Sequence, residues 1–352
     1  MTHILVLNLG STSSKIAIFD NETCIKREEI SHDQALTSLP LEEQITVRRQ
    51  NIEDFIALGT KDEIQLDVIS CRGGLLRPIS GGVYHIDTQM YDDLKSFKYG
   101  VHASNLSGVI GYQLAQDLNV PVYTVDPVVV DELIEVARVT GLKGIERKSI
   151  FHALNQKAVA RQYAKDAQTT YTSINVIVAH MGGGITVGAH ERGDVIDVND
   201  GLLGEGPMSP ERAGSIPNDL LYAFGYEQQL TPKEMAHALS KAGGFISLLG
   251  TNDLKSLAAT YDSDPKVKLA FDALAYQVAK TIGERAVSLK GQVDQIILTG
   301  GLSHNATLVQ NITEYVSWIA DVTVYAGERE MDTLAHRANE VMHGNEDAKW
   351  YR

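Results

Sequence analysis

Two glycine-rich turns in this sequence have the composition of phosphate-binding loops. The first runs from Asn8 to Lys15 and reads Asn-Leu-Gly-Ser-Thr-Ser-Ser-Lys. A tight turn of glycine and hydroxyl residues at a strand end can direct several N–H and O–H donors toward phosphate oxygens. The glycine spacings of the Walker A loop and the Rossmann fingerprint are absent, and an ordinary hairpin turn explains the segment equally well. Its candidate nucleotide-binding residues are Asn8, Gly10, Ser11, Thr12, Ser13 and Lys15.

The second turn strengthens the phosphate-binding interpretation. His180-Met181 is followed by three consecutive glycines, and glycine lets a backbone approach a ligand with no Cβ atom in the way. Two more glycine pairs, at 243–244 and 300–301, end an apparent helix and an apparent strand. Four such clusters at element ends are what a nucleotide held between two halves of a chain would need. The candidate residues here are Gly182, Gly183, Gly184, Gly300 and Gly301.

The elements that position both turns follow one repeated pattern. Residues 2–30 and 174–198 each read as strand, turn, strand, turn, strand, so that Asn8 corresponds to His180. The chain is therefore predicted to be an α/β protein built twice. Further strands are predicted at 66–71, 121–125, 295–299 and 322–325, and helices at 41–58, 104–118, 131–139, 152–167, 232–242, 265–289, 306–319 and 331–343. The break at Gly141 and Gly144 places the boundary near residue 146, with domains 1–145 plus 331–352 and 146–330.

Composition excludes several classes of function. The 352 residues carry a net charge of −14, which opposes general binding to nucleic acid, so any anion must be bound by local groups. The two cysteines, Cys24 and Cys71, form no CxxC or Cys/His cluster and imply neither a disulfide framework nor a structural zinc site. The apolar runs are too short for a membrane span. We expect a cytoplasmic protein.

Several longer motifs resemble the acetate kinase family of the actin-like ATPase superfamily, and within it the butyrate kinases. The motifs are CRGGLLRPI, FHALNQKAVA, AHMGGGITVGAH, EGPMSPERAG, LLGTND and ILTGGL. The likeness runs from Ile4 to about Leu334. It implies a duplicated actin-like, ribonuclease H-like ATPase fold with two domains around a nucleotide cleft. It also implies ATP or ADP as co-substrate, Mg²⁺, and at least a homodimer assembled through the C-terminal domain.

The resemblance assigns roles to six side chains. Arg72 and Arg212 match the active-site arginines of the family, whose planar guanidinium groups can hold carboxylate and phosphoryl oxygens. His180 matches a histidine that donates to the transferring phosphoryl group. Asp126 matches an acid that orients an arginine or the metal shell, although an N-cap before Pro127 explains it equally well. Two further pocket histidines are His102 and His152.

The resemblance also points to a magnesium site. Asn8 is one expected ligand, and an acid in the segment 326–330 is the other. Anchoring on the loop favours Glu328, whereas anchoring on the following helix favours Glu330. Both remain open. The adenosine is expected near Gly300 and Gly301.

The acceptor is expected to be a short-chain carboxylate or, in reverse, its acyl phosphate. Gly73 and Gly74 stand where acetate kinases carry bulky residues, so room for extra methylenes and a preference for butyrate are expected. Each buried methylene is worth about 0.8 kcal/mol. Acetate, propionate and branched acids remain alternatives. The expected acyl pocket comprises Gly73, Gly74, Val101, Phe151 and Leu203.

Two other functions compete with a carboxylate kinase. A sugar or other hydroxyl kinase of the same superfamily would need an Asp base near its acceptor, whereas the acceptor side here offers arginines and histidines. A regulatory or assembly ATPase with an actin-like fold would have no use for Arg72 and Arg212. The sequence therefore favours phosphoryl transfer to a carboxylate.

Overall fold

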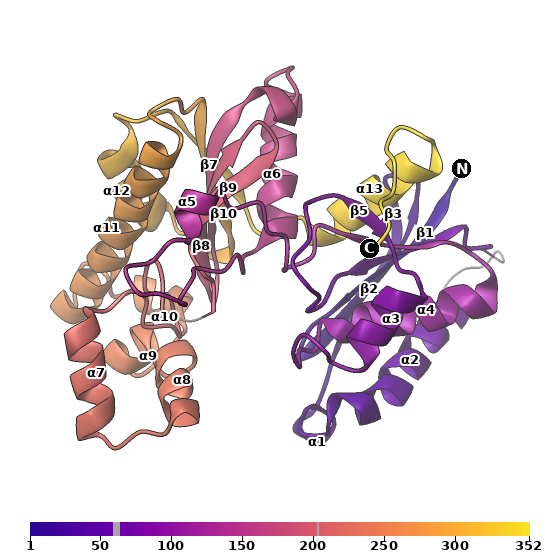
Figure 1. Ribbon diagram of the computed structural model, residues 1–352, viewed down its shortest axis with the longest axis horizontal. Helices are drawn as coiled ribbons and strands as arrows, with labels where there is room; N and C mark the ends of the chain where they lie inside the picture. The colour runs from indigo at the N-terminus through magenta and orange to yellow at the C-terminus, as the bar shows by residue number, and fades with distance from the viewer. Residues whose placement is uncertain (59–63, 203) are drawn as a thin grey trace. The chain divides into compact units, whose positions relative to one another are not determined.

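The chain folds into two compact units, each built around one sheet. The computed structural model describes residues 1–58, 64–202 and 204–352. Unit 1 comprises Met1–Val130 and Arg329–Arg352, and unit 2 comprises Asp131–Glu328. Figure 1 shows both units with their helices and strands.

The two sheets have the same strand order when unit 2 is followed from β9 to β11, and unit 1 has one further strand, β5. Unit 1 has the order β3-β2-β1-β4-β6-β5, and unit 2 has β11-β10-β7-β8-β9. In each unit three antiparallel strands are followed by parallel pairing of a later strand with the first. The strands are β1 (His3–Leu9), β2 (Ser13–Asp20), β3 (Thr23–Ser31), β4 (Val68–Arg72), β5 (Val83–His85), β6 (Val122–Val125), β7 (Asn175–Met181), β8 (Ile185–Glu191), β9 (Asp194–Val198), β10 (Gln295–Gly300) and β11 (Val322–Ala326). The predicted duplication of an α/β unit is confirmed.

Side-chain alternation along β1 directs Asn8 toward a helix. Leu5, Leu7 and Leu9 lie in the buried cluster that α4 (Asn105–Leu118) and α2 (Leu41–Ala57) complete. Because successive side chains of a strand point to opposite faces, Asn8 faces the other side. That side is covered by α13 (Glu330–Met342), which packs on β1, β4 and β6.

The same register directs His180 toward a helix in unit 2. Ile177, Ala179 and Met181 of β7 pack with α11 (Pro265–Ser288) and α12 (Ala306–Val316). The intervening residues of β7 pack against α6 (Ala153–Asp166) on the opposite face of the sheet (Figure 1). His180 therefore faces the side of the sheet that α6 covers.

Most predicted helices form, but several short elements had no clear sequence pattern. The segment between β9 and α11 contains α7 (Asn218–Glu227), α8 (Pro232–Ser240), α9 (Gly244–Leu249) and α10 (Leu254–Ala258), and of these only α8 was predicted. Unit 1 adds α1 (Gln34–Thr37) and α3 (Thr88–Lys95). Helices as short as α1, α9 and α10 carry too few periodic positions for a pattern to stand out.

The boundary between the units differs from the predicted one. Residues 131–145 belong to unit 2, not to the first domain. The helix predicted at 131–139 is only α5 (Glu135–Arg138), because the N–H of Ile134 donates to Ile196 O at 3.1 Å, and Asp131 pairs with Arg138. The bond from Ile134 ties the segment to β9 of the second sheet. At the other end, Arg329 and Glu330 belong to unit 1.

A buried ion-pair network also connects this segment to unit 2 through Arg147, which donates to Ala137 O at 2.7 Å. Asp197 accepts from Arg147 at 2.9 Å, from Arg285 at 2.6 Å and from Ser288 at 2.8 Å. Burial raises the pKa of Asp197, but the charge of Arg285 and the hydrogen bonds from Arg147 and Ser288 outweigh it. The pKa therefore lies below its ordinary value of 3.8.

Within the described part of the chain, no helix combines the length and the apolar character needed to cross a bilayer. Cys24 is exposed, Cys71 is buried, and both are free thiols.

We predict that Asp197→Ala lowers the free energy of unfolding by about 3 kcal/mol at pH 7, because two largely buried guanidinium groups lose their shared counterion. The folded-state pKa is depressed, so this stabilisation is present above pH 3.8 and is lost as the pH falls through the folded-state pKa. Urea unfolding followed by circular dichroism measures both effects. As a control, Asp332→Ala breaks the exposed pair with Arg27 and should cost at most about 1 kcal/mol. Equal losses in the two variants would contradict the prediction.

Candidate active site

A buried arginine supports the first hairpin from inside unit 1. Arg48 of α2 is 0% exposed. It donates to Gly10 O at 2.8 Å and to Ser11 O at 3.1 Å, while Gln44 holds its Nε and Nη2. These bonds occupy the carbonyl groups of the turn. The predicted residues Ser11 and Thr12 are exposed.

Asn8, Arg72 and Glu330 form one cluster in unit 1. The Asn8 amide donates to Glu330 Oε2 at 2.7 Å, and Arg72 Nη1 donates to Asn8 Oδ1 at 3.3 Å. Arg72 and Glu330 lie 3.6 Å apart, with side chains 31% and 8% exposed. Glu328, the other predicted acid, is exposed and belongs to unit 2. The geometry therefore places Glu330, not Glu328, beside Asn8.

This cluster fits a magnesium ion by the chemistry of its donors. Mg²⁺ prefers oxygen ligands and is commonly held by one or two carboxylates together with substrate phosphates and water. Asn8 supplies an amide oxygen and Glu330 a nearly buried carboxylate. Two protein ligands are therefore sufficient if phosphates complete the coordination.

The glycines after Arg72 are required by packing, and their lack of side chains leaves no empty space at these two positions. A Cβ atom on Gly73 would lie 2.3 Å from Pro127 Cβ, and one on Gly74 would lie 2.5 Å from Asn105 Cα. Both positions are buried. Neighbouring residues fill the volume that a larger side chain would need, so these glycines do not in themselves make room for methylenes.

Asn105 links the Arg72 loop to the segment that carries His102. Its side chain is fully buried, accepts from Leu75 N at 2.8 Å and donates to Gly100 O at 3.1 Å. His102 is exposed and its Nδ1 lies 2.8 Å from Ser104 Oγ. Val101, an expected wall of the acyl pocket, is 72% exposed.

Asp126 is buried behind the Arg72 loop in an unusual backbone conformation. Its φ is 38°, in the left-handed region, and its carboxylate accepts from Gly82 N at 2.8 Å. The residues that follow form a turn, not a helix, so Asp126 is not an N-cap. Its carboxylate anchors the strand connection beside Pro127.

In unit 2, Arg212 lies directly against the second hairpin. A Cβ atom on Gly184 would lie 2.1 Å from Arg212 Nη1, so only glycine lets the guanidinium group approach this closely. Ser209 fixes the loop: its Oγ donates to Gly183 O at 2.7 Å, and the Arg212 backbone N–H donates to Ser209 Oγ at 3.2 Å.

The guanidinium group of Arg212 is short of partners. Its Nε is buried and has no hydrogen-bond partner among the described residues. Burial lowers the pKa of Arg212 below its ordinary value, and the carboxylates of Glu211 and Asp200 act in the opposite direction. A buried donor without a partner is costly, and an anion bound at this position would satisfy it.

His180 and His152 stack beside the same hairpin. Their ring centroids lie 3.8 Å apart with an interplanar angle of 9°. Asn155 Nδ2 lies 2.9 Å from His180 Nδ1, and Thr186 Oγ1 lies 2.9 Å from His152 Nδ1. A Cβ atom on Gly182 would lie 3.3 Å from His180 Nε2, so this nitrogen is at the hairpin.

The two glycines after β10 have different surroundings. Gly300 has φ 88°, exchanges hydrogen bonds with Gly327 at 3.0 Å, and would direct a Cβ atom to within 2.4 Å of Met181 O. Gly301 is exposed, and a Cβ atom there would meet nothing within 4 Å. Open space next to the backbone is compatible with the expected adenosine, whereas Gly300 is required by contact with β7.

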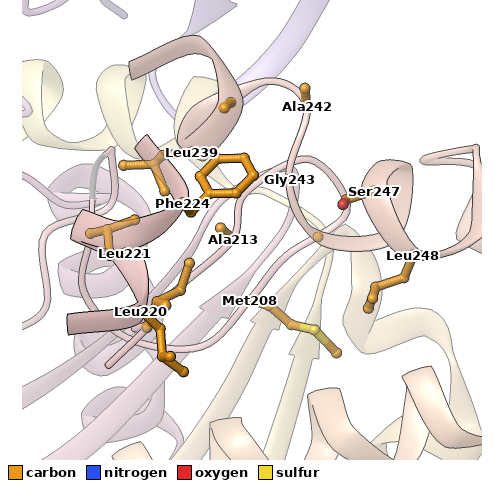
Figure 2. A pocket seen from close by; sticks show the side chains of 13 residues that line it. Met208, Ala213, Leu220, Leu221, Phe224, Leu239, Ala242, Gly243, Ser247 and Leu248 are labelled. Atoms are coloured by element: carbon orange, nitrogen blue, oxygen red, sulfur yellow. The ribbon is translucent and has the colours of Figure 1, made fainter. Parts of the chain in front are cut away.

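The described residues of the expected acyl pocket are divided between the two units and form no cluster within either one. Gly73, Gly74 and Val101 belong to unit 1, and Phe151, which is 2% exposed, belongs to unit 2. Leu203 lies outside the described residues. Figure 2 shows instead an apolar pocket of about 450 Å³ in unit 2, where Leu220, Leu221 and Phe224 of α7 face Leu239 of α8.

This pocket shares a wall with the Arg212 loop. Met208 and Ala213, on either side of the loop, line it, and Ala213 N donates to Leu239 O at 2.9 Å. Helices α7 to α9 therefore support the loop from behind. Among the described residues of the predicted acyl pocket, none lines this pocket.

Sequence reasoning missed the side chains that hold the site residues in place. These are Gln44, Arg48, Asn105, Asn155, Gln156 and Ser209. A signal was present, because polar residues at the buried positions of a helix, such as Asn155 and Gln156 in α6, contradict simple amphipathic patterning and often mark function.

Comparisons with known proteins agree with this architecture. The model of the acetokinase family matches residues 137–345. Among solved structures, a propionate kinase from Francisella tularensis subsp. tularensis SCHU S4 is 19% identical with a TM-score of 0.72, covering 96% of this chain and 99% of that one. The acetate kinases of Porphyromonas gingivalis and Entamoeba histolytica are each 16% identical, with TM-scores of 0.75 and 0.73, covering 97% of this chain and 99% of theirs.

At these identities the structural likeness establishes the fold, which is the duplicated actin-like ATPase fold. The family match covers more than half of the 352 residues, including the second hairpin, His180, Arg212 and Glu330. The chain therefore belongs to the acetokinase family of carboxylate kinases.

Proposed function

We propose that this protein transfers the γ-phosphoryl group of ATP to a short-chain fatty acid, with butyrate as the acceptor, giving butyryl phosphate and ADP. The single observation that carries the proposal is Arg212, whose buried Nε lacks a partner while its guanidinium group lies against Gly184 of a glycine-rich hairpin. A cation held this way is suited to an anion with several oxygen atoms.

The acceptor requires no general base. A fatty-acid carboxylate has a pKa near those of Asp and Glu and is deprotonated at neutral pH. The main barrier is therefore repulsion between two anions, and catalysis depends on positioning and on donors around the phosphoryl oxygens. An acyl phosphate is itself energy-rich, so the reverse reaction is also expected.

In unit 2, Arg212 and His180 would act on the transferring group. The guanidinium group can donate to two phosphoryl oxygens at once. His180 Nε2, beside Gly182, can donate to a third. The backbone N–H groups of the hairpin add donors that carry no net charge.

In unit 1, Asn8 and Glu330 would hold Mg²⁺, which when bound neutralises charge on the β- and γ-phosphates. Arg72, 3.6 Å from Glu330, would bind the carboxylate of the acceptor. The proposed preference for butyrate rests on the likeness of the segment Cys71-Arg72-Gly73-Gly74 to butyrate kinases. It does not rest on the packing of Gly73 and Gly74, which leaves no space for the methylenes of a longer acid.

The first test traps the product with hydroxylamine, which converts an acyl phosphate into a hydroxamate. Arg212→Ala should lower kcat for hydroxamate formation about 10³-fold or more, because the variant loses a charge that stabilises the transition state. ATP binding should change little. The control Arg192→Asn alters an exposed arginine in a left-handed turn and should retain activity. A wild-type protein that forms no hydroxamate with any short-chain acid would overturn the proposal and favour a hydroxyl kinase or a regulatory ATPase.

The second test separates the two candidate metal ligands. Glu330→Gln should raise the Mg²⁺ concentration for half-maximal activity by about tenfold or more, since a neutral amide is a weaker ligand than a carboxylate. Its matched control, Glu328→Gln, should leave that concentration unchanged. Mn²⁺ binding measured by electron paramagnetic resonance gives the same comparison without turnover. The opposite pattern would assign the metal to Glu328.

The third test concerns chain length. The kcat/KM for butyrate should exceed that for acetate by roughly tenfold, the value of two buried methylenes at about 0.8 kcal/mol each. Acetate, propionate, butyrate, isobutyrate and valerate form the series. Gly74→Ala should lower kcat for all acids alike, because its Cβ would displace Asn105 and the Arg72 loop. A maximum at acetate would sink the butyrate assignment.

A further inference from the structure

A chain of hydrogen bonds runs through unit 2 from Tyr171 to His152. We propose that this chain fixes His152 as the tautomer with its proton on Nε2, and that Tyr171, His190, Gln156 and Thr186 are positioning residues for phosphoryl transfer. The structural part stands on its own, whereas the catalytic part rests on the proposed function.

The direction of the chain is set by a backbone carbonyl. Gln156 Nε2 lies 3.0 Å from Thr186 O and 2.8 Å from Thr186 Oγ1. A carbonyl oxygen can only accept, so the NH₂ end of Gln156 must face Thr186. The Thr186 hydroxyl accepts from this amide, which leaves its own proton free to point to His152 Nδ1 at 2.9 Å. In the proposed arrangement His152 Nδ1 accepts this proton, and the ring proton of His152 is on Nε2.

The other end of the chain is consistent with this direction. With its NH₂ on Thr186, Gln156 presents Oε1 to His190 Nε2 at 3.0 Å, so His190 donates from Nε2. His190 Nδ1 must then accept, and Tyr171 Oη is 2.7 Å away. Every link therefore has one donor and one acceptor, beginning at the Tyr171 hydroxyl and ending at His152.

His180 is held by a second, independent anchor. Thr299 Oγ1 donates to Gly327 O at 3.2 Å, which uses its only proton. It must therefore accept from Asn155 Nδ2 at 3.1 Å, and the second proton of that amide is directed to His180 Nδ1 at 2.9 Å. His180 thus has the same tautomer as His152.

In this arrangement both rings present a neutral Nε2–H donor. An imidazole that accepts at Nδ1 is not doubly protonated, since both nitrogens of the cation donate. The two rings are stacked, and His180 Nε2 lies beside Gly182. A pair of neutral donors can bind phosphoryl oxygens with no proton to transfer, which suits an acceptor that is already deprotonated.

Packing shows that the chain is built into the core. Gln156, Thr186 and His190 are each 0% exposed, so water does not replace a lost link. Gly188 of β8 makes space for it, because a Cβ atom there would lie 2.4 Å from Gln156 Oε1 and 3.2 Å from His190 Nε2. Asn155, Gln156 and His152 come from one end of α6, within the motif FHALNQKAVA.

The test compares Thr186→Val, which removes the hydroxyl at nearly constant shape, with Thr186→Ser, which keeps it. In the wild type, side-chain ¹⁵N shifts should show the Nε2–H tautomer for His152. In Thr186→Val they should show a mixture of the two tautomers for His152 and no change for the other histidines. The kcat for acyl phosphate formation should fall about tenfold in Thr186→Val, while the KM for ATP changes little. Thr186→Ser should retain most of the wild-type kcat. The control Thr281→Val removes another buried hydroxyl of unit 2, one that donates to Gln277 O, and should change neither.

A second variant tests the same proposal in case Thr186→Val does not fold. Tyr171→Phe removes the first donor at the partly exposed end and should disturb the His190 tautomer and lower kcat about two- to threefold. In the double variant the two losses should not multiply, because both act through His152. Unchanged ¹⁵N shifts in both single variants would overturn the proposal. If the wild type forms no acyl phosphate, the proposed function fails while the tautomers are still decided by the spectra.

Discussion

The two-residue period of a β-strand determines where the chemistry of this protein lies. In each unit the residue before the last of the first strand is polar and points away from the main apolar cluster and toward a covering helix. Asn8 thereby meets Glu330 at the start of α13, and His180 meets Asn155 near the start of α6. A register shift of one residue would bury Leu7 or Ala179 against these helices and remove both contacts. The duplicated sheet therefore creates two equivalent positions, which are occupied by different polar residues, Asn8 in unit 1 and His180 in unit 2.

The two hairpins are supported by arginines that do different work. Arg48 is completely buried and bonds to carbonyl groups of the first hairpin, so its donors are used within the protein. Arg212 lies against Gly184 of the second hairpin with its Nε unpartnered. A guanidinium group has five N–H donors in a fixed geometry. Where all of them find partners within the protein, as in Arg48, the arginine is structural, and where one does not the arginine is suited to an anionic ligand.

Several glycines near the candidate site make space for neighbouring side chains. Gly184 and Gly188 leave room for side chains that approach the backbone, namely Arg212 and the Gln156–His190 link. Gly73 and Gly74 have the same function for Pro127 and Asn105, which is why their lack of side chains does not translate into an open acyl pocket. The loop that carries Arg72 is instead fixed by the buried amide of Asn105, which accepts from Leu75 N.

The sequence alone determined the duplicated strand pattern, the α/β class and the local motifs around His180, Arg72 and Arg212, because these depend on periodicity and on residues that are adjacent in the chain. Only the tertiary structure showed that Glu330 lies beside Asn8, since this contact is a hydrogen bond across 322 positions. It also moved residues 131–145 into unit 2 through Asp131, Ile134 and the β9 backbone. The contacts that Arg48, Asn105, Asn155 and Gln156 make could not be read from the sequence, because most of their partners are distant along the chain. A buried polar side chain identifies a site only when the atoms that satisfy it are known.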